Sequence, residues 1–418
     1  MRIHQQNWSG HTPFQAACFH QPTSVAEVQE IVRNAQKVRV IGARHSFSDI
    51  DDTTGDLISL DKMDNSIAID HDQRTVTVNA GITYLELCPQ LHQAGYALHN
   101  LASLLHVTVI GACMTATHGS GDALGNLATA VSGLEIVTAD GNLIKLSRQQ
   151  DGDRFNGAVV ALGALGVVTK VTLDLQPTFM MQQDVYQNLP MAQLDQHFSE
   201  ITSAAYSVCM FTNWQQKQMD TTWVKQRLVD DQPVDVPNEF FGATLAPRER
   251  PMDPMSDRNL TTMGVPAPWY DRLPHFYFKD ALLEGNELQS EYFVSRANAL
   301  DAMHAVASLH KELADILSIT EVRTMTADKL WLSPAYGQET VGIHFNWFKK
   351  GPEVLRFLPT LEKTLAPFHA IPHWGKLFAM SGEQMQSLYP RMADFRSLLH
   401  EFDPQGKFRN AFVDRCLF

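Results

Sequence analysis

The chain has 418 residues, of which 44% are hydrophobic and 19% are charged, as in an ordinary globular protein. This length is too great for one comfortable hydrophobic core, so we expect two domains. The formal net charge of −13 argues against nucleic acid and anionic membranes as partners, because binding to either needs a basic face.

The cysteines and the N-terminus suggest a reducing compartment. The five cysteines, Cys18, Cys88, Cys113, Cys209 and Cys416, are widely spaced and include no CxxC pair. This spacing predicts neither a zinc knuckle nor a disulfide framework. The N-terminal MRIHQQNWSG has no apolar stretch of signal-peptide length, and no later window approaches about eighteen apolar residues. We therefore expect a cytoplasmic protein without a membrane-spanning segment.

Helix signals in the first part of the chain are local. Ser24 and Glu27 have the spacing of a capping box and predict a helix over 22–36. Thr83 and Glu86 repeat that spacing and predict a helix through about residue 92. A further helix is predicted over 155–166.

Strand signals alternate with these helices. Apolar alternation predicts early strands at 38–41, 57–60, 66–69, 75–79, 134–137, 143–146 and 167–175. Asp140-Gly141 is a hairpin signal between two of them. The order is an α+β pattern and not a regular βαβ repeat. We place the first domain boundary near residue 178.

Residues 38–50, VRVIGARHSFSDI, combine a short strand with an unusual turn. Gly42 and Ala43 are small, and Arg44, His45 and Ser46 follow them. Such a turn can direct successive backbone N–H groups toward a phosphate. Taken alone, the segment is more typical of an ordinary turn that carries an exposed histidine.

Residues 102–121, ASLLHVTVIGACMTATHGSG, are the densest run of small residues after that turn. Gly111, Ala112, Ala116, Gly119 and Gly121 would let a flat ligand lie against the backbone. The alternative is a loop whose small residues serve packing alone.

The second half of the chain predicts a sheet with helices. Strands are predicted at 207–214, 221–228, 287–294, 320–325 and 341–348, and helices at 298–317 and 352–366. Residues 230–274 are rich in Pro, Asp, Arg and Met, and we interpret them as a long surface excursion, partly disordered.

Three of these strands carry polar residues on one side. Because side chains alternate along a strand, each pair shares a face: Glu321 with Arg323, His344 with Asn346, and Gln289 with Glu291. If the strands are neighbours, they form a polar wall. This wall could be the solvent face of an antiparallel sheet. Its mixture of Gln, Arg, His and Asn instead favours recognition of hydroxyl groups.

The motifs together resemble a known family. Residues 38–50 and 102–121, followed by LGALGVV (162–168), HWGK (373–376) and FRNAF (408–412), are similar to the vanillyl-alcohol-oxidase-type (PCMH-type) flavoproteins. Within these, the chain resembles the alditol oxidases, which act on xylitol or sorbitol. The resemblance runs over residues 8–412.

The resemblance implies an FAD cofactor bound by the first domain. His45 matches the histidine that holds the flavin covalently through its 8α-methyl group. The other implied cofactor contacts are Val40, Ile41, Gly42, Ala43, Arg44, Ser46, Ser103, Thr108, Gly111, Ala112, Cys113, Met114, His118, Gly119, Ser120, Gly121, Gly166, Val167, Val168 and His373. Ala102 matches a position where a small side chain would leave room for O2, although it could equally serve packing.

The resemblance also implies a polyol pocket. Its lining residues match Ser103, Gln289, Glu321, Arg323, His344 and Lys376, while Asn346 stands where family members can carry Thr. As a hypothesis, Lys376 and Arg323 polarise the terminal C1 hydroxyl, Glu321 holds Arg323, and either His344 or Lys376 accepts the hydroxyl proton.

The expected activity is oxidation of a small polyol to the aldose, with O2 reduced to H2O2. The expected architecture is α+β: an FAD-binding domain with two subdomains (1–178), a cap on an antiparallel sheet (179–370) and a returning C-terminal segment (371–418), in a monomer. An aldonolactone oxidase or dehydrogenase on the same fold is the nearest alternative. A metal-dependent hydrolase is disfavoured because the histidines have no HExxH or HxH spacing, and no metal site is predicted. A flavin- or sugar-binding protein without turnover stays open.

Overall fold

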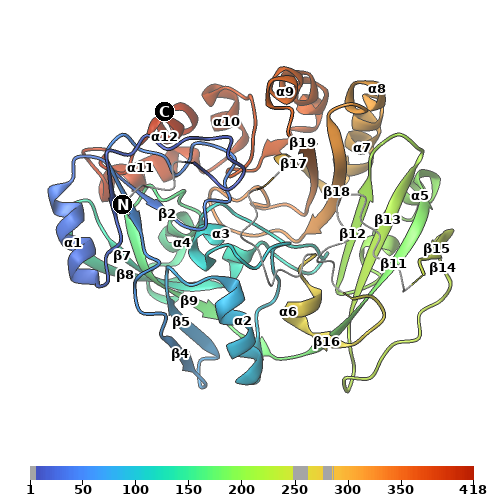
Figure 1. Cartoon of the computed structure of the whole chain (residues 1–418), viewed down its shortest axis with the longest axis horizontal. Coiled ribbons are helices and arrows are strands. Elements are labelled where there is room, and N and C mark those ends of the chain that lie inside the picture. Colours follow the sequence, from blue (N-terminus) through green and yellow to red (C-terminus); the bar gives the residue numbers. More distant parts are fainter. Residues whose placement is uncertain (1–5, 248–261, 276–284, 286) are drawn as a thin grey trace.

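The computed structural model describes residues 6–247, 262–275, 285 and 287–418 (Figure 1). Within these residues the strands form four sheets, and helices accompany them. The α+β class is therefore confirmed. The predicted strands also form, with ends that move by at most three residues.

The first sheet is small and parallel. Its order is β1-β3-β2, with bounds β1 Cys18–His20, β2 Val38–Ile41 and β3 Asp56–Ser59. Helix α1 (Val25–Asn34) connects β1 to β2, and its first turn is capped by the Ser24 hydroxyl, which accepts from the Glu27 N–H. The second hydrogen bond of the capping box would run from the Ser24 N–H to the Glu27 carboxylate. In the structure that carboxylate instead accepts from the N–H of Thr23.

The second sheet is antiparallel, in the order β4-β5-β9-β7-β8. Its strands are β4 Ile67–Asp70, β5 Thr75–Asn79, β7 Val131–Val137, β8 Leu143–Ser147 and β9 Val167–Asp174. The hairpin predicted at Asp140-Gly141 joins β7 to β8, and Gly141 has the positive φ of 78° that favours glycine. Two short strands, β6 Tyr96–Ala97 and β10 Gln176–Pro177, pair separately.

Short helices accompany these sheets. Their bounds are α2 Tyr84–Gln93, α3 Val109–Met114, the 3₁₀ turn η1 Leu127–Ala130 and α4 Arg148–Val159. The capping box predicted at α2 forms in both directions between Thr83 and Glu86. The sequence pattern did not indicate α3.

The helix predicted over 155–166 is wrong at both ends. Helix α4 begins after Ser147, whose hydroxyl accepts from the Gln150 N–H, and it stops at Val159. Leu162 and Gly163 have positive φ angles of 55° and 66°, so the backbone leaves the helical region before residue 166.

The largest sheet has ten strands, and every pairing in it is antiparallel. Its order is β14-β15-β11-β13-β12-β18-β19-β17-β20, and β16 pairs with β11 off this path. The strands are β11 Met180–Pro190, β12 Ser207–Thr212, β13 Gln218–Arg227, β14 Glu239–Phe240, β15 Ala243–Leu245, β16 Ala267–Pro268, β17 Glu287–Ser295, β18 Leu317–Met325, β19 Thr340–Phe348 and β20 Ile371–Pro372.

Helices cover this sheet and close the chain (Figure 1). They are α5 Met191–Thr202, α6 Trp269–Arg272, η2 Arg296–Asn298, α7 Ala299–Ala307, α8 His310–Leu313, α9 Gly351–Leu365, η3 Ala366–Phe368, α10 Gly382–Leu388, α11 Met392–Phe402 and α12 Ala411–Leu417. Helix α5 contacts β11 and β12, and α7 contacts β17. No described helix is long and apolar enough to cross a membrane.

Two predictions in this half need correction. The helix over 298–317 is interrupted between α7 and α8, and it does not reach Leu317, which pairs with Trp347 of β19 and belongs to the sheet. The excursion over 230–274 does not lie wholly on the surface. Trp269 is fully buried, and its N–H donates to the Phe179 carbonyl at 3.2 Å. Residues 248–261 of that excursion, with the disorder expected there, lie outside the described residues.

The C-terminal motif packs back on the N-terminal part, as predicted for residues 402–412. The Val38 N–H donates to the Lys407 carbonyl at 2.9 Å. The buried Arg39 guanidinium donates to the Phe408 carbonyl at 3.0 Å. The Asn410 amide donates to three carbonyls of the turn at residues 49–52. These bonds hold the end of the chain against the segment that follows β2.

Candidate functional site

A pocket opens where the C-terminal ends of β2 and β3 face α3. It encloses about 1000 Å³ of empty space, open solvent at its mouth included. Nine residues predicted to contact the cofactor line it: Val40, Ile41, Gly42, Ala43, Thr108, Gly111, Met114, Gly166 and Val168. Arg39 and Asp51, which the sequence did not single out, line it too. Burial raises the pKa of Asp51 to about 7.

Glycine is needed where the turn after β2 meets α3. A Cβ on Gly42 would lie 2.4 Å from the Thr108 hydroxyl oxygen, and one on Gly111 would lie 2.6 Å from it. Side chains at either position would therefore fill the cradle between the strand end and the helix. A nucleotide that lies against backbone requires such bare walls.

The remaining predicted cofactor residues do not line this pocket. Cys113 and Val167 turn fully buried side chains into the core, and Ala112 is buried beside them. The Ser120 hydroxyl donates to the Val208 carbonyl of β12 at 2.5 Å and so faces away. The others outside the lining are Arg44, His45, Ser46, Ser103, His118, Gly119, Gly121 and His373.

His45 sits on the turn after β2, against an aromatic ring. Its imidazole stacks on Trp8, with ring centroids 4.8 Å apart. Arg44, the residue before it, has a positive φ of 62° and accepts a backbone hydrogen bond from Trp8 at 2.8 Å. Burial, reinforced by the positive charges of Lys376, His106 and Arg44, lowers the pKa of His45 to about 3. The imidazole is therefore neutral near pH 7.

The turn that carries His45 is bonded directly to the HWGK segment. The Phe47 N–H donates to the Gly375 carbonyl at 2.7 Å, and the Ser48 hydroxyl donates to the Trp374 carbonyl at 3.0 Å. Lys376 extends over the Phe47 ring, with its Nζ 5.1 Å from the centroid. Residues more than 320 positions apart thus lie side by side.

The same segment is anchored to β17. The His373 N–H donates to the Glu291 carbonyl at 3.0 Å, and the Leu377 N–H donates to the Gln289 carbonyl at 2.9 Å. Lys376 Nζ donates to the side-chain oxygen of Gln289. Burial, opposed by nearby carboxylates, lowers the pKa of Lys376 to about 8.

The predicted polar wall exists. In the large sheet β19 lies between β17 and β18, and His344 pairs with Glu291 on one side and with Glu321 on the other. These three side chains and Arg323 are buried, with 3% to 7% of their surface exposed. The solvent-face interpretation is therefore wrong. Gln289 and Asn346 form the next pair along the strands and are partly exposed.

Arg323 organises one side of the wall. Its guanidinium donates to the Ser103 hydroxyl at 2.5 Å, to the His118 carbonyl at 3.3 Å and to the Glu321 carboxylate. Burial opposes the charge on Arg323, but Glu321 outweighs it and raises the pKa of Arg323. Arg323 Nε and Glu321 Oε1 are buried without an aligned hydrogen-bond partner in the described residues. Buried polar atoms without a partner are rare, and a catalytic or binding role is one physical explanation for them.

Glu291 is the centre of the wall, although the sequence did not assign it a role. Its carboxylate lies 2.9 Å from His118 Nε2 and 3.2 Å from His344 Nδ1. Burial alone would raise the pKa of Glu291, but the two histidines hold it well below its ordinary value. The ionised carboxylate therefore directs Nδ1–H of His344 toward itself.

His275 was also missed. Its Nδ1 lies 3.3 Å from the Ser103 hydroxyl and 3.1 Å from the Glu321 carboxylate. Burial, with Lys225 and Arg323 nearby, lowers the pKa of His275 well below its ordinary value. No sequence signal indicated this residue, because it directly follows the stretch that we interpreted as a surface excursion.

Comparisons with known proteins agree with this geometry. An FAD-binding-domain model matches residues 16–147, and a D-arabinono-1,4-lactone oxidase model matches residues 284–416. An alditol oxidase of a Streptomyces species is 41% identical over 97% of both chains. The L-gulonolactone oxidase of Mus musculus is 27% identical over 99% of this chain and 98% of its own. The crystal structure of cholesterol oxidase from B. sterolicum superposes with a TM-score of 0.78 at 16% identity, over 99% of this chain and 96% of that one.

The glycine-walled pocket fits an FAD, because most of its lining is small or apolar and falls within the segment that the FAD-binding-domain model matches. The polar wall lies on β17, β18 and β19, which all fall within the second matched segment. The chain belongs to the alditol oxidases, FAD-dependent oxidoreductases of the vanillyl-alcohol-oxidase type.

Proposed function

We propose that this enzyme oxidises the terminal C1 hydroxyl of xylitol and sorbitol to the corresponding aldose, with O2 as electron acceptor. The observation that carries the proposal is the buried wall of Glu321, Arg323 and His344, which adjoins Gln289 and Lys376. Fixed donors and acceptors of this kind suit a chain of hydroxyl groups, because each hydroxyl both donates and accepts. The 41% identity to an alditol oxidase supports the same substrate class.

The residues of the wall have separate tasks in this proposal. Lys376 and Arg323 bind and polarise the C1 hydroxyl, and Glu321 holds Arg323 in place. Gln289 and Asn346 receive hydroxyl groups further along the substrate. FAD held in the glycine-walled pocket would supply the hydride acceptor for C1–H and the route of the electrons to O2, with H2O2 as the product.

The hydroxyl proton has two candidate acceptors. His344 Nδ1 lies 3.2 Å from the ionised Glu291, which accepts from it, and Nε2 lies 3.1 Å from Asn346 Oδ1. In a neutral His344 that donates from Nδ1, Nε2 is the basic nitrogen, and the Asn346 amide then has to present its nitrogen to it. Lys376 has a pKa lowered to about 8, so a fraction of it is a neutral amine near pH 7. A general base works best when its pKa lies near the operating pH, and the pKa of Lys376 satisfies that condition.

The activity is tested by anaerobic mixing of the holoenzyme with xylitol, sorbitol or L-gulono-1,4-lactone, followed by peroxide detection in air. The proposal expects the polyols to reduce the flavin and to yield one H2O2 per aldose formed. Reduction of the flavin by the lactone alone would instead support the second candidate function below.

An aldonolactone oxidase is the second candidate, and two observations favour it. Residues 284–416 match the D-arabinono-1,4-lactone oxidase model, and L-gulonolactone oxidase is similar over nearly the whole chain. The HWGK segment discriminates poorly between the two substrate classes. Gln289 and His344 would be the polar contacts to a lactone ring hydroxyl in that case.

We also propose that His45 carries the flavin covalently at the 8α-methyl group. Attachment needs a neutral ring nitrogen, and the low pKa of His45 supplies one. His45→Ala should release all flavin into the supernatant after acid denaturation, whereas the wild-type mass should exceed the chain mass by one FAD. His106→Ala is the matched control, because His106 is a nearby histidine that also has a lowered pKa. Flavin that stays with the chain in His45→Ala would end the assignment.

The pKa of Lys376 predicts the pH dependence of the reaction. If the ammonium form polarises the hydroxyl, the rate constant of flavin reduction should fall as the pH rises through about 8, because Lys376 loses its proton there. Stopped-flow reduction by xylitol measures this limb, and Lys376→Met should lack it. A rate that rises through the same pH would instead assign proton acceptance to the neutral amine.

We propose three regions with boundaries near 178 and 370. The small parallel and five-stranded sheets use residues up to 174, and the large sheet begins at Met180. Strand β20 extends the large sheet two residues past the second boundary.

A further inference from the structure

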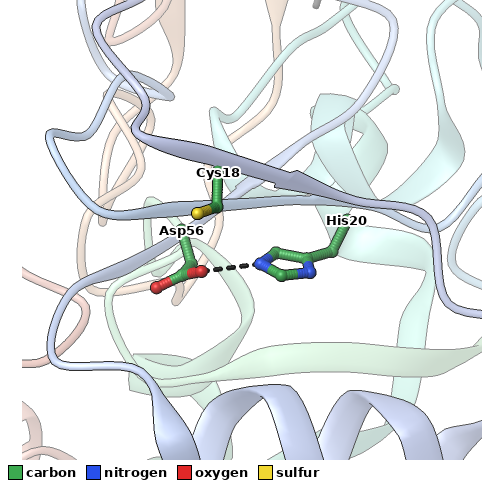
Figure 2. A group of neighbouring side chains, drawn as sticks. All are labelled: Cys18, His20 and Asp56. Atoms are coloured by element: carbon green, nitrogen blue, oxygen red, sulfur yellow. Dashed lines mark hydrogen bonds and ion pairs between the residues drawn. The ribbon is translucent and has the colours of Figure 1, made fainter. Parts of the chain in front are cut away.

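A group of potential metal ligands lies on the small parallel sheet, outside the pocket and the polar wall. It consists of Cys18 and His20 on β1 and Asp56 on β3 (Figure 2). One ligand atom of each residue lies within 4.8 Å of the other two. Figure 2 shows the three side chains on the same side of the two strands, with His20 directed at Asp56.

The strand geometry brings these residues together. Cys18 and His20 are two positions apart on β1, so their side chains share a face. Asp56 pairs with Cys18 in the parallel register of β1 and β3, which places it directly opposite. His20 Nε2 lies 2.6 Å from the Asp56 carboxylate. The ligands therefore come from a paired backbone and not from a flexible loop.

We propose that Cys18, His20 and Asp56 form a binding site for a zinc-like divalent cation, with a fourth position open to water. One thiolate, one imidazole and one carboxylate make a mixed S, N and O set, which suits Zn²⁺ and not the oxygen-seeking Mg²⁺ or Ca²⁺. The thiolate and the carboxylate together neutralise the two charges of the metal. Three protein ligands plus water complete a tetrahedron.

Binding replaces the thiol proton by the metal. The S–H proton leaves to solvent as the Zn–S bond forms, while a neutral His20 binds through Nε2 with its ring proton on Nδ1, and the Asp56 carboxylate binds as an anion. The apparent affinity should therefore rise with pH. Occupation would cross-link β1 to β3, and β3 pairs with β2, which leads into the turn that carries His45.

The second group of ligands in the described residues is a poorer metal site. Cys209, His275 and Glu321 are all buried and lie within the same distance limit. Glu321 already pairs with Arg323 there, and Lys225 is near enough to His275 to lower its pKa. Two cations repel a third. On the small sheet, side-chain exposures of 32% for His20 and 25% for Asp56 also leave an entry path.

Isothermal titration of the reduced-thiol holoenzyme with Zn²⁺ alone tests the proposal. Wild-type protein should bind one equivalent that is absent in Cys18→Ser and at least about tenfold weaker in His20→Gln and Asp56→Asn. His71→Gln is the matched control, because His71 is an exposed histidine outside the group, and it should bind as wild type. Mg²⁺ should give no heat. Equal zinc binding by wild type, Cys18→Ser and Asp56→Asn would overturn the site.

Thiol labelling gives an independent result. Cys18 is exposed and the other four cysteines are buried, so iodoacetamide should label Cys18 first in the native protein. Zn²⁺ should protect Cys18 in wild type, EDTA should restore labelling, and Asp56→Asn should lose the protection although Cys18 is still present. Unchanged melting temperature and flavin content of Asp56→Asn without zinc would show that its fold is intact. Labelling that zinc does not slow in wild type would contradict the proposal.

Discussion

Lys376→Met is expected to slow reduction of the bound flavin by xylitol about 10²–10³-fold, the usual cost of losing one preorganised electrostatic contact to a reacting group. Methionine keeps an unbranched stem of similar length, so packing over the Phe47 ring should be retained. What disappears is the ammonium that donates to Gln289 and, in the proposed mechanism, to the C1 hydroxyl.

Stopped-flow reduction at saturating xylitol measures this effect separately from substrate binding. Lys311→Met, which removes an exposed lysine of α8, is the control and should reduce at the wild-type rate. Flavin content and absorbance spectrum should be unchanged in both variants. Near-normal reduction in Lys376→Met would end the role proposed for this lysine.

Arg323→Met is expected to lower the free energy of unfolding by about 3–5 kcal/mol, because it leaves the Glu321 carboxylate buried without its cation. Arg323 also supplies hydrogen bonds to the Ser103 hydroxyl and to the His118 carbonyl. Urea unfolding near neutral pH, followed by circular dichroism, measures the loss.

Two further variants distinguish this explanation from simple loss of packing. Glu321→Gln combined with Arg323→Met should be more stable than Arg323→Met alone, because no unpaired charge is left in the wall. Arg356→Met breaks an exposed pair with Glu353, at 3.6 Å, and should change stability by less than about 1 kcal/mol. A double variant as unstable as the single one would contradict the electrostatic explanation.

Several elements followed directly from residues that are close in sequence. The capping box of α2 forms between Thr83 and Glu86, and the hairpin turns at Asp140-Gly141. Both depend on bonds that span a few residues, so neighbouring side chains are enough to predict them. A local signal failed where a distant segment supplied backbone hydrogen bonds. Leu317 is not helical as predicted, because it pairs with β19 in the sheet.

The candidate site also has a part that the sequence predicted and a part that only the structure shows. Alternation along β18 and β19 put Glu321 beside Arg323 and His344 beside Asn346, and the structure confirms that the strands are neighbours. The alternation of polar and apolar residues does not predict whether the polar face is exposed to solvent or buried against protein. The sequence placed Glu291 on the polar face without a role, and it gave no signal for His275. Their contacts with His118, His344 and Ser103 span 53 to 173 positions. The sequence shows both Glu291 and His344 on predicted strands, but it does not show that their side chains are in contact.

The sequence by itself determined the α+β class, most strand positions, the turn at His45 and the faces on which polar residues alternate, because each depends on side-chain spacing and on bonds within a few residues. Only the tertiary structure decided that the polar face is buried, that the HWGK segment meets the His45 turn, and that Cys18 and His20 face Asp56. Those outcomes depend on strand register and on contacts between segments that are distant in the sequence. A charge can be buried at such a contact only where an opposite charge or a hydrogen bond compensates it.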